Sequence, residues 1–466
     1  MEVTDVAIEC VKFGLSFTVF LITLSALDDF LVDFLSLLLR KTPQRRGIDS
    51  HHRPKTYVFV ANWHEANVLE NMISGNLRAI GYKPFRFILG VYPNDPETMA
   101  AAGRLERRFK SLVRVVVNPT PGPTSKGQML NVMISEVFRS SKLRPDLVVI
   151  HDSEDVIDPL SFYHYAKLSK RFDYIQIPVF SLDSRKRSWV AAHYMEEFAE
   201  RHSREMRVRS DLGAMVPSAG VGTCMSADLI EFFLRRRGFL FRSDCVTEDY
   251  LLGAEIRKHG FRGCFGYTSF GRPYIATREY FPKNFWASVK QKSRWTFGIA
   301  FQAHRQIGWF GGFWDRYFLY RDRKGLAMNL VPPIAVGFAL GAQWISGWDE
   351  VTVRLAVLNT GLTGFRYLVK TRAVKDVYGY HDSIGIALRW PLIVTINFLA
   401  AFFAWKTFFL SRFATKPVAW AKTEHELPAS FDDTIEGSGP ESSKKKKIRS
   451  VRRTDEENFA SLRYSA

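Results

Sequence analysis

Apolar stretches near both ends of the chain constrain its fold more than any other feature of the sequence. Residues 10–27 (CVKFGLSFTVFLITLSAL) carry one charge, Lys12, and residues 325–345 (GLAMNLVPPIAVGFALGAQWI) carry none. Each stretch is close to the ~20 residues that cross a bilayer as a helix. A cleavable signal peptide is the alternative for the first stretch, but acidic residues precede it where basic residues belong. We therefore expect one transmembrane helix over 1–27 and another over 325–345.

Two further apolar stretches follow the second expected crossing. Residues 353–369 are long enough to return across the membrane if Arg354 and Arg366 snorkel to its surface or form ion pairs. Residues 391–405 number 15, which is short for a crossing. We predict that this last stretch is interfacial or re-entrant, and an ordinary buried helix is the alternative.

Basic residues set the expected orientation of these crossings. The formal net charge is +18 and the isoelectric point is about 9.7, a balance that suits either an anionic membrane face or nucleic acid. The cations flank the apolar stretches, and Arg40, Lys41, Arg45 and Arg46 follow the first one. Because basic loops stay in the cytosol, we expect the segment after this cluster to be cytosolic. We expect no nucleic-acid partner.

The chain divides into six expected regions. They are an N-terminal transmembrane helix (1–27), an amphipathic linker at the membrane surface (28–49), a cytosolic domain (50–275), interfacial helices (276–324), C-terminal transmembrane and interfacial helices (325–413) and a cytosolic tail (414–466). Serine, glycine, glutamate and lysine dominate the tail from about residue 428, which predicts disorder there. The four cysteines lack metal-ligand spacing and indicate a reducing compartment.

The expected cytosolic domain alternates apolar strand patterns with helical patterns. The strand patterns lie at 56–62, 85–92, 112–119 and 146–155. Strands that are buried on both faces and separated by helices predict a parallel α/β sheet. Ligands of such sheets bind beyond the carboxyl ends of the strands. The residues expected there are Trp63, His64, Glu65, Asn94, Asp95, Lys126, Asp152, Glu154 and Asp155.

Acidic residues follow the fourth strand pattern in HDSEDV (151–156). Asp152 and Glu154 are two residues apart, so in extended geometry their side chains project to one face. Two carboxylates at a strand end suit Mg²⁺ or Mn²⁺, with phosphate oxygens completing the coordination. An acidic turn that caps a helix is the alternative, and Asp155 could replace Glu154 as a ligand.

A second acidic motif is CVTEDYLLG (245–253). Asp249 or Glu248 could act as a general base. The alternative is an ordinary helix start, in which Thr247 is the N-cap and the helix dipole favours the acids. Upstream, the glycines of SAGVGTCMS (218–226) permit close approach of the backbone to a ligand, as they would in any tight turn.

The segment QKSRW (291–295) lies shortly before the second expected crossing. Gln291 and Arg294 are three apart and therefore share one face of a helix. The surrounding aromatic residues favour an amphipathic helix at the membrane surface. In that setting the polar face of the helix could cover a site on the cytosolic domain.

Taken in order, these motifs resemble those of a known family. The acidic pair at 152–154, TED at 247–249 and QKSRW at 291–295 resemble the D-x-D, T-E-D and Q-x-x-R-W motifs of family-two membrane glycosyltransferases, which include cellulose and hyaluronan synthases. The strings YPNDPET, HDSEDV, PSAGVGT, TEDY and RWTFGIAFQ are similar to the bacteriophage adsorption protein B branch of that family. The likeness covers residues 20–425 approximately. It departs from the family pattern where D-S-E replaces D-x-D.

The resemblance implies a GT-A fold, which is a Rossmann-like α/β domain that binds a nucleotide sugar and a divalent cation, Mg²⁺ or Mn²⁺. Asp152 and Glu154 are implied to hold the cation. Asp249 is implied to be the general base and to border the acceptor, within a catalytic motif that also contains Thr247 and Glu248.

The resemblance also implies how the two substrates are held. The nucleotide-sugar site would comprise Glu65, Asp95, Lys126, Asp152, Gln291 and Arg294. Arginine suits the diphosphate because it pairs with phosphate through two hydrogen bonds. Trp295 offers an apolar face on which an acceptor sugar can stack.

The function implied by the resemblance is inverting transfer of a sugar from a nucleotide diphosphate, with UDP-linked donors expected, to a growing cell-surface polysaccharide. Transfer would be processive and coupled to export, with an outer-membrane partner or a homo-oligomer assisting. The implied location is the bacterial inner membrane, crossed several times, with the catalytic domain in the cytosol. Non-processive transfer to a lipid carrier is the nearer alternative. A membrane receptor or scaffold with a vestigial site is the other.

Overall fold

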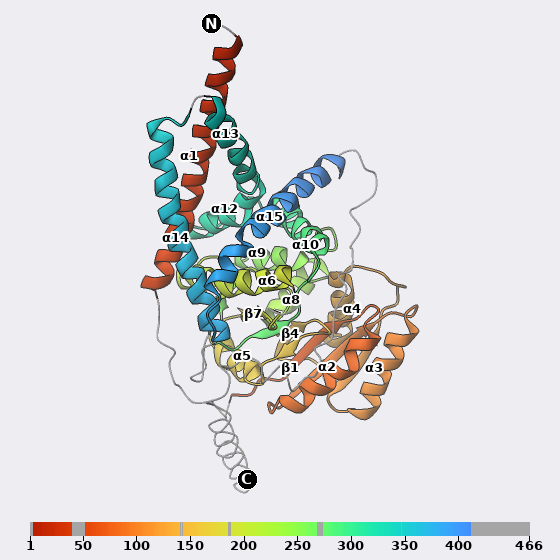
Figure 1. Ribbon diagram of the computed structural model, residues 1–466. Coiled ribbons are helices and arrows are strands. Elements are labelled where there is room, and N and C mark those ends of the chain that lie inside the picture. The colour runs from red at the N-terminus through yellow and green to blue at the C-terminus, as the bar shows by residue number, and fades with distance from the viewer. Residues whose placement is uncertain are drawn as a thin grey trace.

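A computed structural model describes residues 3–39, 52–139, 141, 143–184, 188–267, 274–345 and 347–411 (Figure 1). Within this part of the chain, an α/β domain lies beside a group of long helices that extend away from it. The basic cluster at 40–46 and the tail beyond residue 411 lie outside the described residues. The predicted orientation and the predicted disorder from about residue 428 therefore stay predictions.

The first half of the domain has the predicted alternation of strands and helices. Strands β1 (Thr56–Ala61), β2 (Phe85–Val91), β3 (Val113–Val117) and β4 (Leu147–His151) pair in parallel in the order β3-β2-β1-β4. Helices α2 (Ala66–Ala79), α3 (Pro96–Arg108) and α4 (Lys126–Phe138) connect them. Along β1, Tyr57 and Phe59 belong to one core cluster, and Val58 and Val60 belong to another on the opposite face. Burial on both faces explains the continuous apolar pattern.

The second half of the sheet is mixed, so the prediction of a parallel sheet holds for the four predicted strands and not for the whole sheet. Strand β8 (Thr223–Ser226) pairs antiparallel with both β4 and β6 (Tyr174–Gln176), and β9 (Gly263–Phe265) pairs parallel with β6. The chain reaches β8 through β5 (Val156–Ile157), α5 (Ser161–Ser169), β7 (Val179–Ser181), α6 (Trp189–Glu200), the π-helical η1 (Arg201–Glu205) and α7 (Met206–Asp211). After so long a path, the direction of β8 is set by tertiary packing and not by a short crossover.

A small second sheet extends the domain beyond the predicted boundary at residue 275. Strand β10 (Thr277–Glu279) lies between β5 and β7 in the order β5-β10-β7. Helices α8 (Ala227–Arg237) and α9 (Glu248–Lys258) precede it in the chain. Helix α10 (Phe285–Phe297), π-helical η2 (Gly298–Ala303) and α11 (His304–Ile307) follow, and α10 packs along the C-terminal helix α15 (Ser383–Ser411).

The N-terminal helix is longer than predicted. Helix α1 (Val3–Leu38) continues through the predicted boundary at residue 27 and includes part of the predicted linker. Its 6–38 portion is long and apolar enough to cross a membrane. Phe13 and Phe17 are 72% and 50% exposed, and an apolar face of this kind is typical of contact with lipid.

The expected crossing at 325–345 is broken into two helices. Helices α12 (Phe313–Met328) and α13 (Val331–Ile345) meet at a bend of 43° and together form either a broken span or a re-entrant pair. Pro332 and Pro333 occupy the start of α13, where proline has no backbone N–H to continue the preceding helix. Helix α1 packs against α13 and against α14 (Glu350–Tyr378) (Figure 1).

The two remaining apolar stretches differ in whether their helices are apolar enough to cross a membrane. Helix α14 contains 353–369 but is not one of the described helices that are apolar enough to cross. Its arginines form the expected ion pairs, Arg354 with Glu350 and Arg366 with Glu200. The premise that 391–405 is too short to cross is wrong, because it lies inside the 29-residue helix α15, which meets the length and composition of a span. The interfacial or re-entrant placement of this stretch stays a prediction. The described chain thus has two candidate spans, or three if α12 and α13 form one.

Candidate active site

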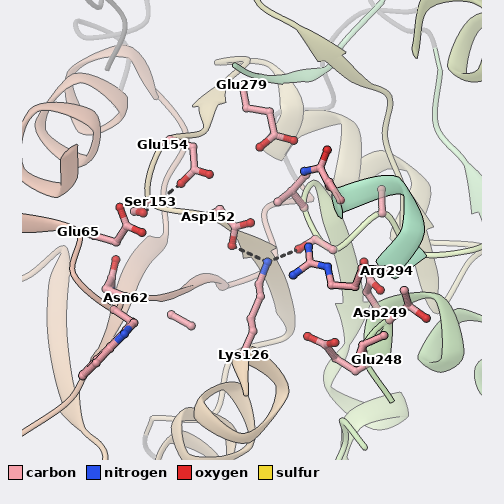
Figure 2. Close-up of a pocket in the computed structure, with 18 of the residues that line it drawn as sticks. Asn62, Glu65, Lys126, Asp152, Ser153, Glu154, Glu248, Asp249, Glu279 and Arg294 are labelled. Carbon is pink, nitrogen blue, oxygen red and sulfur yellow. Dashed lines mark hydrogen bonds and ion pairs between the residues drawn. The ribbon is translucent and has the colours of Figure 1, made fainter. Parts of the chain in front are cut away.

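A cleft opens beyond the carboxyl ends of β1 and β4, at the position predicted for a ligand site. Helix α9, the 219–221 loop, residues 279–282 and helix α10 form its other walls. Figure 2 shows Glu65, Asp152 and Glu154 on one side, Glu248 and Asp249 on the other, and Lys126 between them. The predicted site residues that line the cleft are Glu65, Lys126, Asp152, Glu154, Thr247, Glu248, Asp249, Gln291, Arg294 and Trp295.

The acidic motif after β4 is a turn and not an extension of the strand. The backbone N–H of Asp155 donates to the carbonyl of Asp152 at 3.3 Å. The premise of extended geometry was therefore wrong, although Asp152 and Glu154 both reach the cleft. Glu154 accepts a hydrogen bond from Ser153 Oγ at 3.1 Å.

Asp155 supports this turn from beneath and is not a cleft residue. Its Oδ2 lies 2.6 Å from His151 Nδ1 and accepts the backbone N–H of Asp152 at 3.1 Å. Burial raises the pKa of Asp155 well above its usual value, and burial lowers the pKa of His151 to about 3. The geometry disfavours Asp155 as the alternative metal ligand, because its carboxylate is turned toward His151.

Lys126 stands at the N-terminus of α4 and joins two walls of the cleft. Its ammonium lies 2.5 Å from Asp152 Oδ1 and donates to the carbonyl of Gly220 at 3.1 Å. Burial by itself lowers the pKa of Lys126, but the carboxylate of Asp152, followed by those of Glu248 and Asp249, outweighs burial and raises it. Lys126 is therefore a cation among the six acidic residues that line the cleft, which are Glu65, Asp152, Glu154, Glu248, Asp249 and Glu279.

The carboxylates of the TED motif lie at the N-terminus of α9. Thr247 occupies the N-cap position, but its side chain makes no capping hydrogen bond. Burial, followed by the charge of Asp249, raises the pKa of Glu248 to about 7. Burial likewise raises the pKa of Asp249. The motif is thus more than a helix start, since it holds two half-buried carboxyl groups whose pKa values are raised.

Gly220 brings the glycine-rich turn against this pair. Its φ is +79°, and a Cβ at this position would lie 2.7 Å from Asp249 Oδ2. Only glycine adopts that conformation readily and leaves room for the carboxylate. The sequence suggested close approach to a ligand, and the structure shows close approach to a cleft side chain.

The QKSRW segment forms the second half of α10, as its helical spacing predicted. Gln291, Arg294 and Trp295 line the cleft, and Lys292 points instead toward α6 and α15. Gln291 Oε1 accepts a hydrogen bond from the hydroxyl of Tyr194 at 2.8 Å. Figure 2 shows Arg294 beside the TED motif.

Asp95, which the resemblance assigned to the nucleotide-sugar site, does not line the cleft, and neither do His64, Asn94 and Asp155. Its carboxylate caps α3 by accepting the backbone N–H of Thr98 at 3.3 Å. It also accepts the backbone N–H of His64 at 2.7 Å. Asp95 therefore holds the loop that carries Glu65, and only 2% of its surface is exposed.

Several cleft residues had not been predicted. They include Asn62, Tyr92, Ser153, Glu279, Tyr280 and Phe281. Tyr92 and Asn62 directly follow strands, so the rule of strand ends could have found them. Glu279 ends a three-residue strand, too short for any periodic signal, and only the pairing of β10 brings it to the cleft.

The cleft has donors suited to a hard divalent cation. Asp152 and Glu154 supply two carboxylates, and no group of three or more histidine, cysteine or acidic residues within the described ranges forms a complete metal cage. Mg²⁺ is commonly bound by one or two carboxylates together with water and substrate phosphates. The pair fits that pattern, with Lys126 sharing the Asp152 carboxylate.

Comparison with known proteins identifies the family. Residues 53–298 match the family described as glycosyltransferase like family 2. The chain belongs to this family. The match includes all three predicted motifs, which confirms the predicted resemblance.

Two curated relatives and one solved structure agree with this assignment. The chain is 30% identical over 460 residues to bacteriophage adsorption protein B of Escherichia coli strain K12 and to bacteriophage N4 adsorption protein B of Escherichia coli O157:H7. The matches cover 88% of this chain, which spans 61% of the length of those relatives.

The solved structure is the mannosyltransferase PcManGT from Pyrobaculum calidifontis, in complex with GDP-Man and Mn²⁺. It is 16% identical, with a TM-score of 0.55, covering 81% of this chain and 99% of that one. The likeness shows that the α/β domain has the predicted GT-A fold.

Proposed function

We propose that the protein transfers a sugar from a nucleotide diphosphate to an acceptor hydroxyl with inversion at the anomeric carbon. The observation that carries the proposal is the cleft itself, which the Lys126–Asp152 ion pair and the half-buried Asp249 carboxyl line together. Family membership and the complex of PcManGT with GDP-Man support a nucleotide-sugar donor.

Asp249 is proposed as the general base. Its raised pKa favours uptake of a proton from the acceptor hydroxyl. The hydroxyl oxygen then bonds to the anomeric carbon while the bond from that carbon to the diphosphate oxygen breaks, and the diphosphate leaves with the electron pair. Glu248 and the N-cap Thr247 lie beside Asp249 at the start of α9.

The donor diphosphate is proposed to lie between Lys126, Arg294 and Gln291, whose side chains offer N–H donors at the cleft. Asp152 and Glu154 would hold Mg²⁺ or Mn²⁺. When bound, the cation would neutralise negative charge on the departing diphosphate. Glu65 lies at the end of β1, where the nucleoside would fit, and Asp95 supports it from behind.

The acceptor is proposed to enter along α10. Trp295 lines the cleft, and α10 packs along α15, a candidate membrane span. An acceptor that reaches Asp249 from this side would come from the membrane. We therefore propose that the acceptor is a growing cell-surface polysaccharide and that transfer is processive and coupled to export. The proposed location is the bacterial inner membrane, with the cleft in the cytosol. The same geometry favours one alternative, which is single transfer to a lipid carrier.

The test is a donor screen on the purified full chain in lipid nanodiscs. UDP- and GDP-linked sugars are supplied with Mg²⁺, Mn²⁺ or a chelator, and release of the nucleoside diphosphate is measured. Turnover of at least one donor that stops with the chelator is expected. Binding of donors without release under any condition would refute the proposed enzyme and favour a receptor or scaffold.

A second measurement decides between the two acceptors. The donor that is turned over is supplied with a radiolabelled sugar, and the products are sized. A ladder of long products supports a processive synthase. A single labelled glycolipid would overturn the processive claim and leave the transferase claim intact.

A further inference from the structure

One tyrosine of α6 lies against the QKSRW helix at its centre. Tyr194 is fully buried. Its hydroxyl accepts a hydrogen bond from Ser288 Oγ at 3.0 Å and donates one to Gln291 Oε1 at 2.8 Å. Both partners belong to α10, one turn apart. Of these three residues, Gln291 alone lines the cleft.

The ring of Tyr194 contacts the rest of the motif. Lys292 Nζ lies 5.5 Å from the ring centroid, and Trp295 meets the ring edge-on with centroids 6.5 Å apart. Phe281, another cleft residue, stacks on it with centroids 5.0 Å apart. A single buried side chain therefore contacts Gln291, Lys292 and Trp295 of α10 and Phe281 of the wall formed by residues 279–282.

Lys292 holds the same helix through a second set of polar contacts. Its ammonium donates to Glu197 Oε2 at 2.5 Å and to Asn397 Oδ1 at 3.0 Å, and lies 3.0 Å from His193 Nε2. These partners belong to α6 and α15. Because adjacent residues of α10 are bonded to α6, the helix cannot rotate about its axis without breaking two polar contacts.

The bond to Tyr194 determines what Gln291 presents to a ligand. A glutamine amide has one acceptor oxygen and two donor hydrogens. With Oε1 engaged by the phenol, the N–H groups are the part of the amide left for a ligand. Burial raises the pKa of Tyr194, so the phenol keeps the proton that it donates.

The structure assigns Tyr194 the role of a positioning residue, which orients the Gln291 amide so that its N–H groups meet an oxyanion in the cleft. This inference rests on the proposed function, in which that oxyanion is the donor diphosphate. Tyr194 does not line the cleft and acts through Gln291.

The test compares Tyr194→Phe, Gln291→Ala, Gln291→Glu and the double variant Tyr194→Phe/Gln291→Ala, all as full chains in nanodiscs. Tyr194→Phe keeps the ring and removes the hydroxyl. We expect a five- to tenfold fall in kcat/KM, approximately, mainly through the donor KM. Gln291→Glu should lose as much as Gln291→Ala, because a carboxylate can accept from Tyr194 but cannot donate. The double variant should be no worse than Gln291→Ala.

Tyr82→Phe is the matched control. Tyr82 is also fully buried, and its hydroxyl donates to the carbonyl of Pro54 at 2.7 Å, at the opposite edge of the sheet. It should retain the wild-type donor KM. Thermal unfolding of every variant shows whether the fold is kept.

Two results would overturn the inference: wild-type kinetics for Tyr194→Phe, or losses that multiply in the double variant. A binding arm separates it from the proposed function. Calorimetry with UDP and with GDP alone should show weaker binding by Tyr194→Phe and by Gln291→Glu. Unchanged binding overturns the role of Tyr194 even if transfer is found, whereas weakened binding without any turnover supports that role and counts against the enzyme.

Discussion

The pKa values of several cleft residues depend on burial and on the charges of their neighbours. Lys126 lies within 2.5 Å of Asp152, and its cation also acts on Glu248 and Asp249. Those two carboxyl groups are raised in pKa by burial, while Lys126 partly opposes the rise. A carboxylate with a raised pKa takes up a proton more readily than an ordinary one, which is what a general base requires.

Asp249→Asn tests that role. The amide is nearly the same size but cannot take a proton, so we expect turnover to fall by about 100-fold or more, while UDP or GDP binding is retained. Asp244→Asn is the matched control, because Asp244 is 60% exposed and pairs with Arg242. It lies outside the cleft, on the loop that leads into α9. Initial rates and calorimetry provide the two measurements. Unimpaired turnover would remove Asp249 from its proposed role.

The pH dependence follows from the same pair. A raised pKa keeps the pair protonated to higher pH, so kcat/KM should rise with pH toward and through 7, where Glu248 titrates. Stability has the opposite sign, because the unfolded chain releases the Glu248 proton near 4.5 and the folded chain near 7. The contribution of Glu248 to the free energy of unfolding therefore decreases as the pH rises from 4.5 to about 7. A rate profile that is flat from mildly acid to mildly alkaline pH would contradict this account.

Helix packing holds the motifs in place at the scale of elements. Gly298 follows α10, and a Cβ there would lie 2.4 Å from Thr247 Oγ1. The QKSRW helix can therefore approach the start of α9 only if this residue lacks a side chain. Two motifs about 40 residues apart in the sequence meet because of one glycine in a helical conformation.

Gly298→Ala should reduce turnover by forcing these helices apart. Alanine favours a helix over glycine by about 1 kcal/mol, so loss of activity would be steric in origin and not a failure to form the helix. Gly364→Ala in α14 is the matched control, since a Cβ there meets no atom within 4 Å. Rates and circular dichroism distinguish the two effects. Full activity of Gly298→Ala would show that the contact is not limiting.

A buried network of charges joins the membrane-associated helices to the transferase domain in the whole molecule. Arg321 of α12 bonds to Asp28 of α1 at 2.6 Å and to Glu205 of η1 at 3.1 Å. Arg366 of α14 bonds to Glu200 of α6 at 2.7 Å. The pairs with Glu205 and Glu200 join α12 and α14 to the segment between β7 and β8, and the pair with Asp28 joins α12 to α1, so together they hold the two parts in one arrangement.

Arg321→Leu should destabilise the protein by about 3–5 kcal/mol, because it removes the cation paired with Glu205 and one of the two cations paired with Asp28. The side chain of Arg321 is 5% exposed. Arg354→Leu is the control, because its pair with Glu350 is 76% and 78% exposed and should contribute at most ~1 kcal/mol. Thermal unfolding in detergent compares the two. Equal stability of both variants would show that the network is not needed to hold the helices.

The sequence by itself determined the first four strands, because parallel strands buried on both faces produce apolar runs that need no knowledge of their neighbours. It also determined the family, since three motifs in a fixed order are local patterns. The length of α15 was misjudged because a helix includes flanking polar residues that an apolar count omits. The acidic motif was placed on a strand because backbone hydrogen bonds that form a turn leave no periodic signal.

Tertiary structure alone decided what surrounds the motifs. The antiparallel direction of β8, the arrival of Glu279 at the cleft and the contact of Tyr194 with Gln291 each join segments separated by many residues. Such contacts depend on how helices and strands pack, and sequence spacing carries no record of packing. The residues proposed to carry out the chemistry could therefore be predicted from the sequence. The residues that orient them could be identified only from the tertiary structure.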